Sequence, residues 1–144
     1  MIEQDTIKLL RECDAGVKMG IASIDDVLDR VKQEPMRATL RDCKKEHEAL
    51  HEKIQGRLQR FQDEGKNPNP IAKSMSYMKT TFKLGLNETD ETVASLMTDG
   101  CNMGVKSLGK YLNQYKAADE KSRTITKKLI RLEETLAEDL QKFL

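Results

Sequence analysis

The sequence has few of the residues that β-sheets and irregular loops need. Among 144 residues there is no Trp, the aromatic fraction is 4%, and only eight Gly and three Pro occur. No segment alternates apolar and polar residues in the way that a half-buried strand does. Leu, Lys, Glu, Met and Ala dominate instead, which is typical of long helices. The composition therefore predicts an all-α protein.

An excess of charge of one sign is also lacking. The 25 Lys and Arg residues nearly cancel the 24 Asp and Glu residues, so no long-range field attracts nucleic acid or an anionic membrane. No run approaches the roughly 18 consecutive apolar residues of a membrane-spanning helix. The chain begins without the basic and apolar regions of a secretory leader, and its three cysteines cannot all pair within one chain. We expect a cytoplasmic protein with no membrane span and no nucleic-acid partner.

Apolar residues recur at intervals of three and four along most of the chain, and this spacing places them on one face of a helix. The pattern predicts four long helices within a single domain that comprises residues 1–144. The predicted ranges are 2–31, 35–61, 88–115 and 119–143. The connections after the first and third helices are short, so each of these pairs should form an antiparallel hairpin. Gly65 is expected to form a left-handed cap that ends the second helix, and a short crossover helix is predicted for residues 71–86.

An internal repeat relates the two predicted hairpins. The segment CDAGVK at residues 13–18 matches CNMGVK at residues 101–106 in four of six positions. A weaker match aligns HEALHE at residues 47–52 with EETLAE at residues 133–138. With its crossover, this arrangement resembles the ferritin-like superfamily, and the whole chain is similar to small bacterial four-helix bundles related to it. The resemblance implies a ferritin-like four-helix bundle made of two related hairpins.

The stretch HEALH at residues 47–51 has the letter pattern H-E-x-x-H of zinc proteases. In such a helix His47 and His51 lie one turn apart on one face and bind zinc, while the glutamate acts as a general base. The chemistry also requires a third ligand and, by resemblance to those proteases, a sheet whose edge strand holds the substrate. The sequence has no further histidine and no strand pattern. We therefore predict that the protein is not a protease and that it is not an enzyme.

The ferritin-like resemblance suggests a different metal chemistry. Oxidases of this superfamily bind two irons with a Glu from each of two helices and a Glu-x-x-His from each of the other two. Here the motif occurs once, as Glu48-x-x-His51, because Ala137 stands where the second histidine is needed. The repeat also aligns Asp14 with Asn102, which is a weaker ligand. The remaining candidate ligands for one iron, manganese or zinc ion are Asp14, Glu48, His51 and Glu133.

The hairpin geometry offers a structural explanation of the same histidines. If the first hairpin folds near residue 33, His47 comes level with Gly20, and His51 comes level with Gly16. The two glycines would then leave room for the imidazole rings in the core. Each buried ring needs a hydrogen-bond partner, and Asp14 is the predicted acceptor for His51.

The cysteines and the crossover segment complete the set of candidate residues. All three cysteines lie on apolar stripes and are predicted to be small core side chains. The crossover segment carries a stripe of Met75, Met78 and Phe82, through which the chain could bind itself or a protein partner. The sequence as a whole favours a non-catalytic helical-bundle protein that acts as an interaction or stress-type module, with a degenerate ferritin-like metal site. The alternative is a carboxylate–histidine metal-binding protein of the ferritin-like type.

Overall fold

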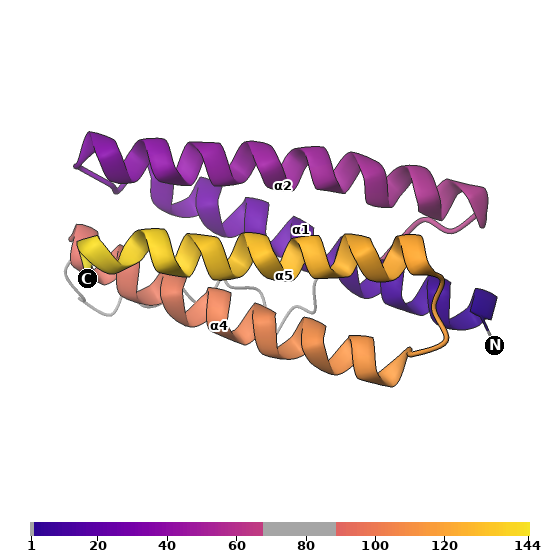
Figure 1. Cartoon of the computed structure of the whole chain (residues 1–144). Helices are drawn as coiled ribbons and strands as arrows, with labels where there is room; N and C mark the ends of the chain where they lie inside the picture. The colour runs from indigo at the N-terminus through magenta and orange to yellow at the C-terminus, as the bar shows by residue number, and fades with distance from the viewer. Residues whose placement is uncertain (1, 68–88) are drawn as a thin grey trace.

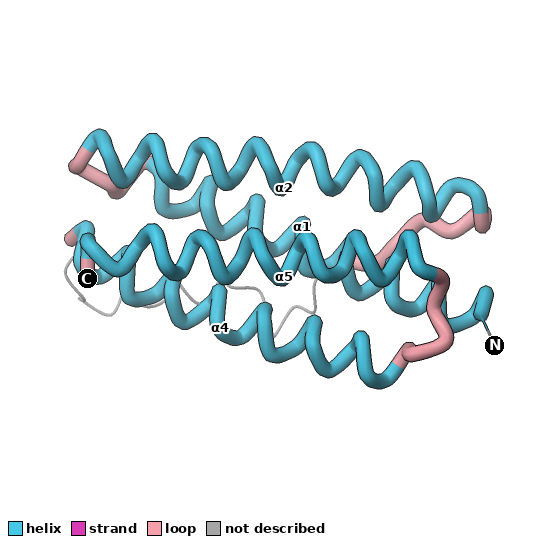
Figure 2. The backbone as a smooth tube through the Cα atoms, in the orientation of Figure 1, coloured by secondary structure: helices cyan, strands magenta, loops and turns pink. Residues whose placement is uncertain are grey.

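The computed structural model describes residues 2–67 and 89–144, and these residues form four long helices and one short 3₁₀ helix. The elements are α1 (Ile2–Leu28), α2 (Glu34–Arg60), α4 (Asp90–Gln114), α5 (Glu120–Leu140) and η1 (Gln141–Phe143). No strand occurs in this part of the chain (Figure 2). The four predicted long helices are thus confirmed, with ends that differ by at most three residues from the predicted ones. The predicted crossover helix at 71–86, with Met75, Met78 and Phe82, lies outside the described residues.

Local sequence signals explain where the helices begin. Pro35 stands in the first turn of α2, where its missing N–H is no loss. The side chain of Thr89 accepts a hydrogen bond from the backbone N–H of Thr92 and thereby caps α4. Asp119 caps α5 through the N–H of Ser122 in the same way. These caps satisfy N–H groups that would otherwise lack a partner in the first turn of each helix.

The prediction that Gly65 caps α2 is wrong. The helix ends at Arg60, and the left-handed residue that follows it is Gln62, with a φ of 56°. Gly65 also has a positive φ, of 90°, but it lies further along the chain. A Cβ atom on Gly65 would lie 2.3 Å from Oδ2 of Asp14. The glycine therefore allows the backbone to pass close to a buried carboxylate.

The four helices form a bundle in which α1 and α2 are antiparallel neighbours, as are α4 and α5 (Figure 1). Helix α2 ends where α1 begins, whereas α4 begins at the opposite end of the bundle. As a result α1 runs parallel to α5, and α2 runs parallel to α4. None of the described helices has a stretch long and apolar enough to cross a membrane.

Hydrogen bonds connect the two hairpins at both ends of the bundle. At one end, the carboxylate of Asp90 in α4 accepts hydrogen bonds from the backbone N–H groups of Lys32 (2.8 Å) and Gln33 (2.9 Å). Burial by itself raises the pKa of Asp90, but these two N–H groups lower it below its ordinary value. At the other end, the N–H of Asp119 donates to Oγ1 of Thr6 at 2.8 Å. The first helix of each hairpin thus binds the loop of the other hairpin.

The apolar core consists of two clusters, one in each half of the bundle. The cluster nearer the α1–α2 loop includes Ile24, Leu40, Met97, Leu136 and Leu140. The cluster in the other half includes Leu10, Ile54, Leu108, Ile125 and Leu129. Full burial of such side chains contributes about 1.5–3 kcal/mol each to the free energy of folding, so both clusters hold the four helices together. The level between the clusters is polar.

Candidate functional site

One residue from each long helix contributes to a central layer between the two apolar clusters. We define this central layer as Gly20 of α1, His47 of α2, Gly104 of α4 and Glu133 of α5. A Cβ atom on Gly20 would lie 2.8 Å from both Cδ2 and Nε2 of His47, and one on Gly104 would lie 3.6 Å from Cδ of Glu133. The prediction that Gly20 makes room for His47 is confirmed. A Cβ atom on Gly104 would be in ordinary van der Waals contact with Glu133, so this second glycine is not required by space.

The His47 ring is buried, with 1% of the side chain exposed, and both of its nitrogens face acceptors. Nε2 lies 2.9 Å from Oε1 of Glu133, and Nδ1 lies 2.9 Å from the carbonyl oxygen of Cys43. Both nitrogens donate only when the ring is an imidazolium cation. Burial by itself lowers the pKa of His47, but the side chains of Cys43 and Glu133, which both lie within hydrogen-bond distance of the ring, raise this pKa to about 10. The central layer therefore contains a buried ion pair at neutral pH.

The three thiols are buried and unpaired, which confirms their prediction as core side chains. Sγ of Cys43 lies 3.5 Å from Nδ1 of His47. Burial raises the pKa of Cys101, and the neighbouring Glu133 carboxylate raises it further. Burial also raises the pKa of Cys13, to about 12. Because the thiolate is the form that reacts with electrophiles and binds metals, burial and the raised pKa values disfavour both reactions at Cys13 and Cys101.

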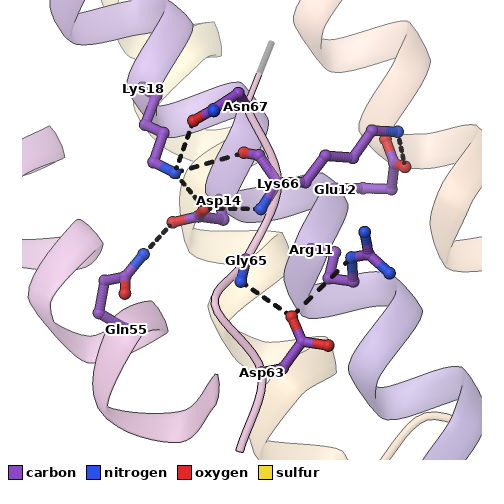
Figure 3. A network of polar contacts seen from close by, with 9 residues as sticks. All are labelled: Arg11, Glu12, Asp14, Lys18, Gln55, Asp63, Gly65, Lys66 and Asn67. Atoms are coloured by element: carbon purple, nitrogen blue, oxygen red, sulfur yellow. Dashed lines mark hydrogen bonds and ion pairs between the residues drawn. The ribbon is translucent and has the colours of Figure 1, made fainter. Parts of the chain in front are cut away.

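A second polar centre surrounds Asp14, whose side chain is fully buried (Figure 3). Its carboxylate accepts hydrogen bonds from Nε2 of Gln55 at 2.7 Å and from the backbone N–H of Lys66 at 3.0 Å. Nζ of Lys18 forms an ion pair with it at 2.7 Å, and Nε2 of His51 lies 3.2 Å from Oδ1. The prediction that His51 faces Asp14 is confirmed. The buried carboxylate is thus fully satisfied, as a charge without water must be.

The Asp14 centre also holds the segment that follows α2. Nζ of Lys18 donates to the carbonyl oxygen of Lys66 at 3.4 Å and to Oδ1 of Asn67 at 3.3 Å. The ammonium group of Lys66 forms an ion pair with Glu12 of α1. Figure 3 shows this segment lying across α1, with its backbone turned toward the Asp14 carboxylate. Asp14 therefore joins three parts of the chain, namely α1, α2 and the segment at residues 63–67.

The prediction that Gly16 makes room for His51 is wrong. A Cβ atom on Gly16 would meet Leu129 of α5 at 3.7 Å, and no atom of His51 is among its nearest neighbours. His51 lies at the edge of the α1–α2 seam, where 30% of its side chain is exposed and Asp14 faces it. An imidazole in that position needs no space in the core.

The four candidate metal ligands lie in three different places. Asp14 and His51 face each other, Glu133 pairs with His47 in the central layer, and Glu48 is exposed on the surface of α2. Within residues 2–67 and 89–144, no three His, Cys, Asp or Glu side chains form a group that could hold a metal ion. The two imidazoles of HEALH each face a carboxylate from another helix, Glu133 of α5 and Asp14 of α1.

Sequence reasoning missed several partners of Asp14. Lys18 stands four residues after Asp14, and an acid and a base at this spacing on a helix are neighbours, so this signal was present. Gln55 likewise follows His51 by one turn, on the side of α2 that faces α1. The backbone N–H of Lys66 has no signal in the sequence, because its position depends on the path of the chain beyond α2.

Comparison of the chain with protein-family models, with curated proteins and with solved structures finds no match in any of the three.

Proposed function

We propose that this protein is a non-catalytic interaction module built on a ferritin-like bundle, in which hydrogen-bonded side chains occupy the level of a metal site. The observation that carries the proposal is the pairing of both HEALH imidazoles with carboxylates of other helices. An imidazole that already pairs with a carboxylate of another helix acts in packing and helix register.

The state of His47 opposes metal chemistry in the central layer. Metal binding to an imidazole requires a lone pair on one ring nitrogen, and an imidazolium has none. Both nitrogens of His47 face acceptors, and the pKa of about 10 keeps the ring protonated at neutral pH. The exposed Glu48 cannot assist, because it lies outside the core.

Two observations support the ferritin-like part of the proposal. Helices α1 and α5 are parallel, as are α2 and α4 (Figure 1), which is the order expected when two hairpins are joined by a connection between opposite ends of a bundle. In addition, His47 and Glu133 occupy the same position of the internal repeat, and they touch each other. Equivalent positions of two related hairpins meet in this way when a pseudo-twofold axis passes between α2 and α5.

The metal-binding alternative has its support in one pair of residues, Asp14 and His51. Their facing atoms lie 3.2 Å apart, and His51 is partly open to solvent. The Asp14 carboxylate, however, already accepts from Lys18, Gln55 and the Lys66 backbone. An ion would have to displace these donors, so the geometry favours the non-catalytic module.

The three free thiols also support a reducing compartment as the place of action. Disulfides form and persist in oxidising compartments, and these buried cysteines form none. We include a cytoplasmic location in the proposal on this ground.

Elemental analysis of protein purified without added chelator tests the proposed function. We expect iron, manganese and zinc far below one equivalent per chain, and urea unfolding curves that EDTA leaves unchanged. His51→Ala is the informative variant, with the exposed Glu48→Ala as its matched control on the same helix. Stoichiometric metal that is lost in His51→Ala but kept in a folded Glu48→Ala protein would overturn the proposal in favour of the metal-binding alternative.

A further inference from the structure

Helices α2 and α5 lie side by side (Figure 1). Side chains of both helices line a shallow groove along the seam between them. The groove consists of two adjoining hollows that share Lys53. Small side chains contribute much of its lining, including Ala49 and Gly56 of α2 and Thr124 of α5. From residue 46 to residue 60 of α2 the groove is about 21 Å long, at 1.5 Å per helical residue.

Basic side chains predominate along this groove, although the whole chain has a net charge of only +1. The acidic residues of the lining are Glu46 and Glu120. The basic residues of the lining are Lys53, Arg57, Arg60, Lys121, Lys128 and Arg131. Arg57 forms an ion pair with Asp119 at 2.6 Å, whereas the other five basic residues are exposed and form no ion pair within the part of the chain that the structure describes. The groove therefore offers positive charge that the described residues leave uncompensated.

We propose that this groove binds an acidic helix of a protein partner, an inference that depends on the proposed function of the chain as an interaction module. On α2, Lys53, Arg57 and Arg60 recur at intervals of four and three residues, so they form one row along the groove. Basic residues of α5 form the opposite row. Carboxylates at the same spacing on a partner helix would face these rows, while the small residues of the floor allow the helix to approach closely.

The lining favours a protein partner over a nucleic acid. Among the residues that the structure describes, no aromatic side chain lines either hollow, so this lining lacks the stacking platforms that hold unpaired bases. Glu46 lines one hollow and Glu120 lines the other, at opposite ends of the groove. A continuous phosphate backbone would meet a carboxylate at both ends. A short acidic helix of about 14 residues fits between them.

Fluorescence anisotropy with the full chain and a labelled synthetic peptide tests the proposal. The probe is a helix-forming peptide of Ala, Leu and Glu with glutamates at the i, i+4 and i+7 positions, and its counterpart has Lys in place of each Glu. We expect the acidic peptide to bind, the basic peptide to remain unbound, and the affinity to fall as salt screens the charges. Amide chemical shifts in the ¹⁵N-labelled protein should change in residues 46–60 and 120–135.

A matched pair of double variants locates the binding surface. Lys53→Glu/Lys128→Glu reverses two charges of the groove and should weaken peptide binding about tenfold, which corresponds to about 1.4 kcal/mol. Lys45→Glu/Lys127→Glu makes the same change of charge at exposed positions of the same two helices that line neither hollow. This control should weaken binding less than about twofold, since screened charges outside the contact contribute little. Circular dichroism and urea unfolding establish that both variants fold like the parent.

Several results would overturn the proposal. These are the absence of peptide binding at low salt, equal losses in the two double variants, shifts confined to other helices, or tighter binding of a 15-nucleotide single-stranded DNA. The metal analysis separates this proposal from the proposed function. If the protein is free of metal and does not bind the acidic peptide, only the proposal of an acidic helical partner is refuted. If the protein holds stoichiometric metal through His51, the proposed function is refuted, whichever peptide binds.

Discussion

Gly20→Ala adds a single methyl group at the tightest point of the central layer. The new Cβ atom would lie 2.8 Å from Cδ2 and from Nε2 of His47, well inside ordinary van der Waals contact. The imidazole is held on one side by Glu133 and on the other by the carbonyl oxygen of Cys43. It therefore cannot turn away from the methyl group without stretching one of these hydrogen bonds.

Opposing effects set the size of the change. Replacement of glycine by alanine within a helix stabilises it by up to about 1 kcal/mol. Overpacking of a tight site costs about 1–3 kcal/mol, and the loss of a hydrogen bond to a charged group costs about 1.5–3 kcal/mol. The ring of His47 can move only in part. We therefore expect the cost of overpacking to exceed the gain in helix propensity, with a net loss of about 1–3 kcal/mol in the free energy of unfolding.

Urea unfolding followed by circular dichroism measures this change, and the chain supplies its own controls. No atom of residues 2–67 and 89–144 lies within 4 Å of a Cβ atom built on Gly100 or Gly109 of α4, so Gly100→Ala and Gly109→Ala should stabilise the protein by up to about 1 kcal/mol. In the double variant Gly20→Ala/His47→Ala the clash is gone. The alanine at position 20 should then be neutral or stabilising relative to His47→Ala alone.

A tight contact between Gly20 and His47 would be refuted if Gly20→Ala were as stable as the parent or more stable, while Gly100→Ala was more stable than the parent. The helix would then have room at Gly20, and the central layer would be looser than the 2.8 Å contact implies. A loss that persisted in full in the double variant would also contradict it, because His47 would not be the cause.

Three further predictions concern the same two polar centres. The pKa of His47 is raised from 6.5 to about 10, so its contribution to stability is fully present below pH 6.5 and is lost as the pH rises toward 10. Between pH 6.5 and 8.5 the free energy of unfolding should fall by up to about 2 kcal/mol more in the parent than in His47→Gln, and equal slopes would contradict the buried ion pair. Asp14→Asn keeps the shape of the side chain but removes the charge that faces Lys18, so urea unfolding should show a loss of about 2 kcal/mol; an unchanged midpoint would mean that the buried carboxylate is dispensable. Gly65→Ala should cost about 2 kcal/mol, because alanine is strained at a φ of 90° and its Cβ would lie 2.3 Å from the Asp14 carboxylate. Thermal denaturation measures this loss. A higher melting temperature for Gly65→Ala than for the parent would refute the close approach of residues 63–67 to Asp14.

The sequence predicted those contacts that depend on short connections. The loop between α1 and α2 is short, so the level of each residue along the hairpin follows from a rise of 1.5 Å per residue, and the pairing of His47 with Gly20 was predicted correctly. The same calculation placed Gly16 level with His51, but the prediction that Gly16 makes room for His51 was wrong. The height of a residue along the helix axis does not tell which way its side chain points around that axis. Asp14 lies on the side of α1 that faces His51, and Gly16 faces Leu129 of α5.

Contacts between the hairpins were harder to predict. Glu133 was predicted as a candidate metal ligand and not as the partner of His47. The relative placement of α2 and α5 depends on how two hairpins dock, and no short connection joins them. The backbone of Lys66 was unpredictable for a related reason, since its position over Asp14 follows from the chain path after α2.

The internal repeat of the sequence aligns the two members of the His–Glu pair at the centre of the bundle. His47 and Glu133 stand at the same position of that repeat, and they meet across the seam of α2 and α5 with 2.9 Å between Nε2 and Oε1. Identical ionised residues at such a position would place like charges in contact within the core, which neither two carboxylates nor two imidazolium rings tolerate without losing a charge. One basic and one acidic residue resolve the conflict, provided that the neighbouring helices leave room for both side chains. Gly20 gives that room beside the His47 ring, because a Cβ atom on Gly20 would lie 2.8 Å from the imidazole. Glu133 needs no such space, since a Cβ atom on Gly104 would lie 3.6 Å from its carboxylate carbon, an ordinary van der Waals contact.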